Sequence, residues 1–144
     1  MKPLPHVYHA QLSANPEGYV PVRVDGLPDL RVAAPADFDG PGDAWSPEHL
    51  LMASVETCFV FTLRAVAHAN KLEWKSLELS GAGTLDRKDG AMRFTEIVLR
   101  PRLTIPTGTD KERAMRVLER SEKGCLISAS LATPVRLEPE IVLG

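Results

Sequence analysis

Residues 46–70 read SPEHLLMASVETCFVFTLRAVAHAN, and this stretch decides the fold because it predicts one long helix. Ser46 is a good helix cap, Pro47 suits the first helical position, and neither Gly nor Pro follows before Asn70. Apolar side chains occur on nearly every side of this helix, so nearly every side should be covered. Because one small domain can hardly surround such a helix, we expect a second copy of the chain to cover part of it.

The composition limits the function classes. The chain has 144 residues, enough to bury a core, and we predict a single domain over residues 1–144. A formal net charge of -2 leaves no basic excess for binding nucleic acid or a membrane surface. The longest apolar stretch is interrupted by Glu56, Arg64 and His68, which indicates a buried helix instead of a membrane span. The N-terminus lacks the apolar core of a signal peptide, and we expect a cytoplasmic protein.

The sequence pattern predicts strands before and after the long helix, and a second helix after it. Strands are predicted over 5–12, 18–24, 30–34, 72–86, 91–105 and 134–142. A second helix should open at Thr109 with Glu112 in a capping box, and end at Gly124. Gly81 and Gly83 mark either a bulge or a close approach of another backbone. The order β-β-β-α-β-β-α-β indicates an α+β domain.

The chain has two cysteines, Cys58 inside the long helix and Cys125 just after the second helix. Structural disulfides rarely persist in the cytoplasm, so the two thiols are either inert or redox-active. A buried cysteine usually behaves as a small apolar residue, and that interpretation stays open for Cys58. Because Cys58 lies far from the helix N-terminus, an activated thiolate there needs a cation from elsewhere.

Two motifs resemble those of a known family. Ser46-Pro47-Glu48-His49-Leu50-Leu51, followed by Cys58-Phe59, resembles the OsmC/Ohr family of osmotically inducible protein C and the organic hydroperoxide resistance proteins. Cys125-Leu126-Ile127-Ser128 is similar to that family's second motif, a Cys-x-x-Ser just after a helix. Each motif is weak alone, but both together, in this order, are fairly specific. The resemblance extends to the order of elements over almost the entire chain.

The resemblance implies an intertwined homodimer whose long central helices pack against curved antiparallel sheets. It also implies a cysteine-based peroxidase that reduces organic hydroperoxides in oxidative-stress defence. Cys58 would be the peroxidatic thiol, Cys125 the resolving thiol that closes a disulfide with it, and Glu48 the carboxylate that orients the site. No bound cofactor or metal is expected. The electrons would come from an external dithiol protein, in this family often a lipoyl-bearing one.

One departure from the family concerns its arginine, which usually pairs with the glutamate and activates the thiol. Arg23 and Arg31, on nearby predicted strands, could replace it, whereas Arg64 points to a different helical face from Cys58. Glu48 lies roughly 15 Å from Cys58 along a straight helix, so it should serve the site of the other subunit. A carboxylate in the first helical turn is also favourable through the dipole alone.

Two alternatives to catalysis remain. The chain could be a non-enzymatic protein of the same fold that binds a hydrophobic ligand, or a redox sensor that oxidises without efficient turnover. The missing arginine favours the first alternative, and the retained cysteines favour catalysis. If a peroxide pocket exists, its expected apolar walls are Leu51, Met52, Phe59 and Phe61.

Overall fold

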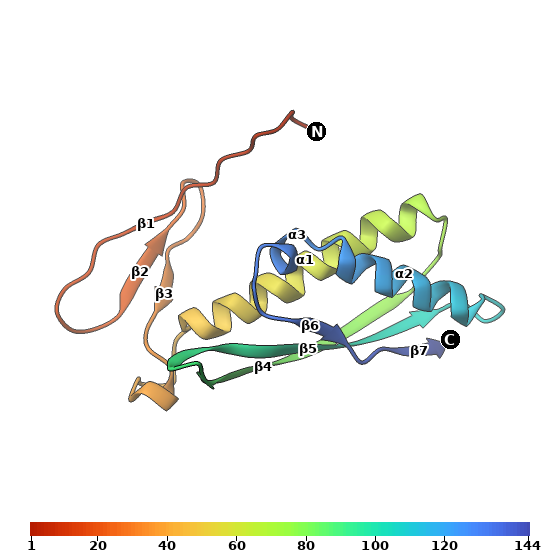
Figure 1. Cartoon of the computed structure of the whole chain (residues 1–144). Helices are drawn as coiled ribbons and strands as arrows, with labels where there is room; N and C mark the ends of the chain where they lie inside the picture. Colours follow the sequence, from red (N-terminus) through yellow and green to blue (C-terminus); the bar gives the residue numbers. More distant parts are fainter. The chain divides into compact units, whose positions relative to one another are not determined.

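The computed structural model describes residues 1–144, and the chain forms two compact units, Met1–Leu51 and Met52–Gly144. The boundary between the units falls inside helix α1 (Pro47–Ala69), so each unit is described separately. Strands and helices are both present, which confirms the predicted α+β class (Figure 1). The single domain predicted over residues 1–144 stays a prediction.

The first unit contains a small antiparallel sheet. Its strands are β1 (Gln11–Leu12), β2 (Val20–Arg23) and β3 (Leu30–Val32), in the order β1-β2-β3. All three lie inside predicted strands, but they are shorter than predicted. A short 3-10 helix, η1 (Ala36–Phe38), follows, where neither a helix nor a strand was predicted. Val32 then bridges to Trp45, which leads the chain into α1.

The second unit is built on a larger sheet. Its strands are β4 (Ser76–Lys88), β5 (Ala91–Ile105), β6 (Val135–Leu137) and β7 (Glu140–Leu143). β4 pairs antiparallel with one edge of β5, while β6 and β7 pair parallel with β5. The single strand predicted over 134–142 is therefore wrong. Pro139 lacks the N–H that a continuous ladder needs, and the pairing breaks there.

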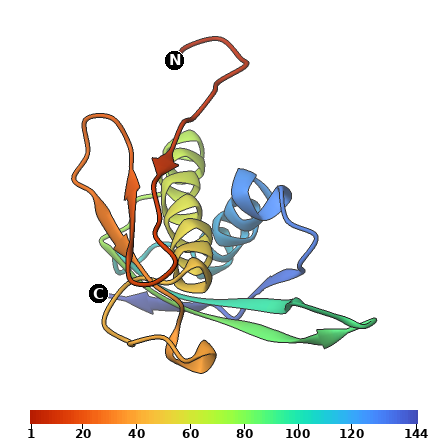
Figure 2. The ribbon, with the colours of Figure 1, turned by 90° about the vertical axis from the view of Figure 1, so that its left-hand side faces the viewer.

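Three helices accompany the sheet of the second unit: α1, α2 (Lys111–Lys123) and α3 (Leu126–Ala129). Figure 2 shows that α1 and α2 lie on the same face of this sheet. The core between them contains buried apolar side chains from both layers, including Phe59, Leu63, Leu99, Leu103 and Leu118. The four-residue helix α3 was not predicted, because it is too short to show a period.

Helix α1 begins and ends as predicted, and the single chain covers only one side of it, as we expected; whether a second copy covers the rest stays a prediction. Its fully buried residues are Val55, Phe59, Leu63 and Ala67, which are spaced by four and form one stripe. By length and composition alone, α1 is long and apolar enough to cross a membrane, since an 18-residue window of it has a mean hydropathy of 1.6. Only 22% of that window is buried inside the chain. Core helices of soluble proteins also have such lengths and compositions. The apolar side away from the stripe is therefore left uncovered within one chain.

Close contact with β4 fixes how α1 sits on the sheet. The register of β4 and β5 shifts between Thr84 and Leu85, so no bulge lies at Gly81 or Gly83. A Cβ atom on Gly81 would lie 2.6 Å from Glu56 Oε1, and one on Gly83 would lie 2.6 Å from the Met52 sulfur. The alternative prediction, a close approach of another backbone, is also wrong, because the close neighbours are side chains; those from α1 place this side of the helix directly on the strand.

The ends of α2 were predicted to within one residue. Asp110, not Thr109, is the N-cap, and its carboxylate accepts a hydrogen bond of 2.9 Å from the backbone N–H of Glu112. The capping box predicted at Thr109 is therefore wrong, because a carboxylate acceptor is present one residue later. Gly124 ends the helix as predicted. A Cβ atom there would lie 3.4 Å from the Thr62 methyl carbon, so the end of α2 lies against α1.

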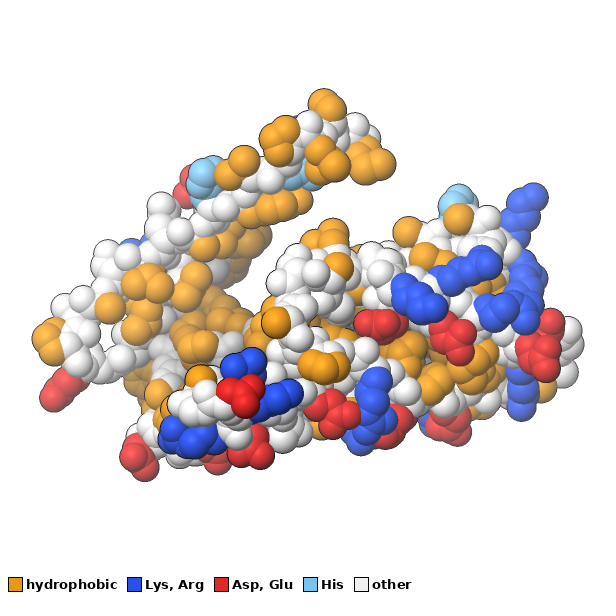
Figure 3. Space-filling model, viewed as in Figure 1, with side chains coloured by type: hydrophobic (Ala, Val, Ile, Leu, Met, Phe, Trp, Pro, Cys, Tyr) orange, Lys and Arg blue, Asp and Glu red, His pale blue; other side chains and the backbone are white.

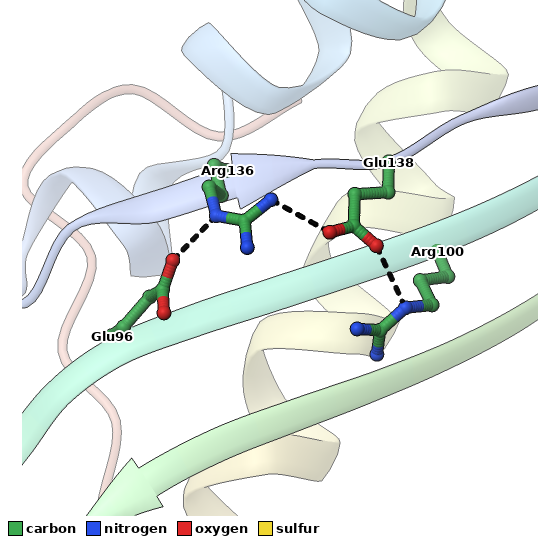
Figure 4. Close-up of polar contacts among 4 residues, drawn as sticks. All are labelled: Glu96, Arg100, Arg136 and Glu138. Atoms are coloured by element: carbon green, nitrogen blue, oxygen red, sulfur yellow. Dashed lines mark hydrogen bonds and ion pairs between the residues drawn. The ribbon is translucent and has the colours of Figure 1, made fainter.

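The face of the sheet away from the helices carries paired charges. Arg100 donates a hydrogen bond of 2.9 Å to one carboxylate oxygen of Glu138, and Arg136 donates one of 2.8 Å to the other oxygen (Figure 4). Arg136 also pairs with Glu96. On the same face, Arg102 pairs with two further glutamates. These side chains are exposed, so each pair contributes little to stability. Their effect is to neutralise this surface locally.

Candidate active site

The fold brings the two cysteines close together. Cys58 comes from the middle of α1, and Cys125 is the N-cap residue of α3, just beyond the end of α2. Both are free thiols, and they lie near enough for the Cys125 thiol, as a hydrogen-bond donor, to lower the pKa of Cys58. Sequence alone did not establish that they would meet. Their catalytic roles remain predictions at this point.

Hydrogen bonds activate Cys58. Its partial burial raises its pKa, but donors from the Ile127 backbone, the Cys125 thiol and the Thr62 hydroxyl outweigh that effect. The backbone N–H of Leu126 adds a smaller contribution in the same direction. The net pKa of Cys58 is therefore below its ordinary value, which raises the thiolate fraction. No cation in the chain contributes to this shift, whereas we expected one to be needed.

Cys125 has the opposite protonation preference. Burial raises its pKa, the hydrogen bond to Cys58 raises it further, and contacts with Ser128 lower it only in part. Its side chain is only 1% exposed. The resulting pair has one thiol that favours the thiolate and one that stays protonated. Such asymmetry is what a nucleophilic thiolate beside a protonated thiol requires, with Cys58 the more readily ionised of the two.

An open pocket of about 460 Å³ gives access to Cys58. Its lining comes from one side of α1 and from α3: Ser54, Thr57, Cys58, Phe61, Thr62, Ala65, Leu126 and Ile127. Phe61 and Leu126 are 61% and 67% exposed, so large apolar side chains flank the opening. Arg64 is exposed and lies over the Phe61 ring, 5.3 Å from its centroid. A small or extended apolar molecule could therefore reach the sulfur of Cys58.

Three of the four expected pocket walls are wrong. Phe59 is fully buried in the core stripe, Met52 packs against Gly83 of β4, and Leu51 does not line the pocket. Only Phe61 was correctly expected. The missed residues follow a signal that the sequence contained, because positions three and four before or after Cys58 share its helical face.

Glu48 and the two candidate arginines belong to the first unit. The Oε2 atom of Glu48 is buried and has no hydrogen-bond partner in the chain. Arg23 forms an ion pair of 3.2 Å with Asp29. Arg31 donates to the backbone carbonyl of Asp43 at 2.9 Å and lies over an aromatic ring. The chain itself therefore supplies no donor to that oxygen of Glu48.

Comparison with known proteins identifies the family. The family described as OsmC-like protein matches the chain over residues 40–140, which includes both cysteines and Glu48. The chain is a member of the OsmC-like protein family. The resemblance seen in the two sequence motifs is confirmed.

The proteins that this chain resembles differ considerably from it in sequence. Uncharacterized protein YmaD of Bacillus subtilis (strain 168) is 26% identical over 112 residues, 76% of this chain and 75% of that protein. An organic hydroperoxide resistance protein of Xanthomonas axonopodis pv. citri (strain 306) is 28% identical over 121 residues, 81% of this chain and 80% of its own. A solved OsmC-like protein of unknown function from Vibrio cholerae matches with a TM-score of 0.84 at 17% identity, covering 93% of this chain and 99% of its own. That structural match shows a shared fold.

Proposed function

We propose that this OsmC-like protein is a cytoplasmic, homodimeric thiol peroxidase that reduces organic hydroperoxides to alcohols. The observation that carries the proposal is the pair of neighbouring thiols with opposite pKa shifts beside an open, mainly apolar pocket. The Xanthomonas relative, named an organic hydroperoxide resistance protein, supports the substrate class. Apolar groups at the pocket opening favour alkyl or aryl hydroperoxides over hydrogen peroxide.

The first step uses Cys58. Its thiolate attacks the terminal oxygen of the hydroperoxide, the O–O bond breaks, and the alkoxide leaves as an alcohol after taking a proton. Cys58 becomes a sulfenic acid. The donors that stabilise the thiolate, from Ile127 and Thr62, also hold its sulfur beside the pocket. Oxidation by two electrons at sulfur balances the reduction of the peroxide.

The second step uses Cys125. Its sulfur attacks the sulfenic sulfur of Cys58, the S–O bond breaks, and hydroxide leaves as water with the thiol proton. The two thiols are near enough to shift each other's pKa, which supports formation of a disulfide between them. An external dithiol then returns two electrons by thiol–disulfide exchange and restores both thiols. A lipoyl-bearing protein is the expected donor, and no bound cofactor is required.

A homodimer would complete the structure in two ways. The uncovered apolar side of α1 needs burial, and a second copy of α1 offers a matching surface. The orphaned carboxylate oxygen of Glu48 needs a donor, since a buried unpaired oxygen is costly. An arginine from the partner, Arg23 or Arg31, would supply that donor. Glu48 would then orient the site of the partner subunit instead of its own.

The test is consumption of cumene hydroperoxide with dithiothreitol as the electron donor. Cys58→Ser should fall to the uncatalysed background, because no nucleophile remains. Without dithiothreitol, Cys125→Ser should accumulate over-oxidised Cys58, seen by mass spectrometry, whereas the wild type should stop at the disulfide after about one equivalent of alcohol per chain. Equal rates for the wild type and Cys58→Ser would refute the peroxidase. A Cys58–Cys125 disulfide without turnover under several reductants would indicate the redox sensor.

A further inference from the structure

Helix α2 carries a row of positive charges on its surface. Arg113, Arg116, Arg120 and Lys123 are spaced by three and four residues, so they share one side of the helix. The buried residues Ala114 and Leu118 lie on the other side of the helix. Figure 3 shows Lys and Arg side chains gathered over α2. The row holds four of the five cations of α2, in a chain whose net charge is -2.

No charge of this row lies in an ion pair of 4 Å or less. Three glutamates, Glu112, Glu119 and Glu122, lie on the same helix. Burial raises the pKa of Glu122, and the charge of Lys123 lowers it in part without forming such a pair. The guanidinium of Arg120 donates to the side-chain oxygen of Asn70 at 2.9 Å, and Arg113 donates to the Asn70 carbonyl. These acceptors are neutral. By contrast, arginines on the outer face of the sheet are paired with glutamates (Figure 4).

The row ends beside the thiol pair. Lys123 is its last member, and Gly124 and Cys125 follow directly. The end of α2 approaches α1 at Thr62, and Thr62 lines the pocket that opens on Cys58. A partner held by the row would therefore have its own reactive group close to the two sulfurs.

We propose that the α2 row is the docking surface for the protein that reduces the Cys58–Cys125 disulfide, and that this reductant is acidic around its dithiol. The inference rests on the proposed function, which supplies the disulfide. One thiolate of the partner attacks a disulfide sulfur, the Cys58–Cys125 bond breaks, and the released thiolate takes a proton. The second thiol of the partner then displaces the restored cysteine, leaving the partner oxidised by two electrons.

A protein partner fits the row better than nucleic acid. The row covers about 15 Å of helix, the length of a small protein patch. It holds four cations in a chain of net negative charge, whereas specific DNA binding typically uses six to ten phosphate contacts. Its position next to a disulfide also matches the need of a reductant.

The test uses two synthetic dithiol peptides that differ only in flanking charge, four glutamates in one and four lysines in the other. The disulfide is prepared with diamide, so the test does not depend on peroxidase activity. At about 20 mM salt the acidic peptide should reduce the wild-type disulfide at least about tenfold faster than the basic peptide. This ratio should approach one at about 500 mM salt, because the charges are then screened.

Two matched variants separate docking from net charge. Arg116→Glu with Lys123→Glu should reverse the preference between the peptides and leave reduction by dithiothreitol unchanged. Arg87→Glu with Arg93→Glu, on the β4–β5 hairpin, makes the same charge change and should keep most of the preference.

Two outcomes would overturn the docking proposal. One is that both double variants change the preference between the peptides equally, and the other is that the wild type reacts with the two peptides at nearly equal rates at low salt. Binding of a 12-nucleotide single-stranded DNA that is lost in the α2 double variant would assign the row to nucleic acid instead. Failure of diamide to join Cys58 to Cys125 would overturn this inference together with the peroxidase. If the wild type showed no peroxidase activity but kept its preference for the acidic peptide, only the proposed function would be overturned.

Discussion

The two sides of α1 differ in what covers them. The inner side presents Val55, Phe59 and Leu63, which are fully buried against the second unit's own sheet and α2. The outer side presents Cys58 and Phe61 and is open, although its side chains are also largely apolar. The inner side is thus complete within one chain, whereas the outer side needs a partner or a ligand.

This difference places the cysteine of α1 where the proposed chemistry needs it. On the inner stripe a thiol would be sealed in an apolar core and would behave as a small hydrophobe. On the outer side Cys58 meets backbone donors from α3, and a substrate can enter. The same helix therefore provides stability on one side and chemistry on the other. Four substitutions along α1 test this division, beginning with the largest expected effect.

Replacing Phe59 by Ala should destabilise the protein by about 3–5 kcal/mol, because a fully buried ring leaves a cavity. Urea unfolding followed by circular dichroism measures this change. The matched control is Phe61→Ala, since Phe61 is 61% exposed within the chain. If the control loses as much stability as Phe59→Ala, measured at low protein concentration, the two sides of α1 are not distinct.

Phe61→Glu should weaken the proposed dimer, because a charge then enters the apolar surface between two copies of α1. We expect the dissociation constant to rise about 100-fold, equivalent to about 2.7 kcal/mol, by sedimentation velocity across a dilution series. Met92→Glu is the control: Met92 is 57% exposed, on the β4–β5 hairpin. A monomeric wild type, or equal dissociation of both variants, would contradict the dimer.

The division of α1 into two sides shows where sequence reasoning succeeds. The helix start was predictable because capping by Ser46 and Pro47 is local chemistry, and the apolar stripe of α2 was predictable because its other side is charged. The direction faced by α1 was not predictable, since a helix that is apolar all round gives no preferred side. For that reason Phe59 and Met52 were assigned to the pocket although they face the core and the sheet.

The meeting of Cys58 with Cys125 depends on long-range packing and could not be derived from spacing. It requires α2 to end against Thr62 and α3 to turn its backbone N–H groups toward Cys58. The motif resemblance suggested this pairing, but the periodicity of either helix did not. The hydrogen bonds that lower the pKa of Cys58 were missed for the same reason, because backbone donors have no side-chain signature.

Thr62→Val should raise the pKa of Cys58 by removing a donor to its thiolate. At pH values below the pKa the thiolate fraction falls, so the alkylation rate should fall about two- to tenfold, the net worth of one hydrogen bond. At high pH both proteins are fully ionised and should react alike. The pH profile of iodoacetamide labelling at Cys58 measures this. Ser54→Ala, also in the pocket wall, should keep the wild-type midpoint, and a Thr62→Val profile that overlays the wild type would exclude the hydroxyl as a donor.

Glu56→Gln should give the smallest effect, a gain of stability at neutral pH. Burial on the sheet side of α1 raises the pKa of Glu56, so its carboxylate is less favourable in the folded chain than in the unfolded chain. The stability of the wild type relative to the variant is therefore highest at pH values below the unfolded pKa, and it declines as the pH rises through the folded pKa. We expect a gain of about 0.5 kcal/mol at pH 7, because the side chain is partly solvated, and no difference near pH 3.

Urea unfolding at both pH values measures this gain in stability, with Glu73→Gln, at an exposed position, as the control. A gain that persists unchanged at pH 3 would mean that packing of the amide against Gly81, and not removal of a buried charge, stabilises the variant.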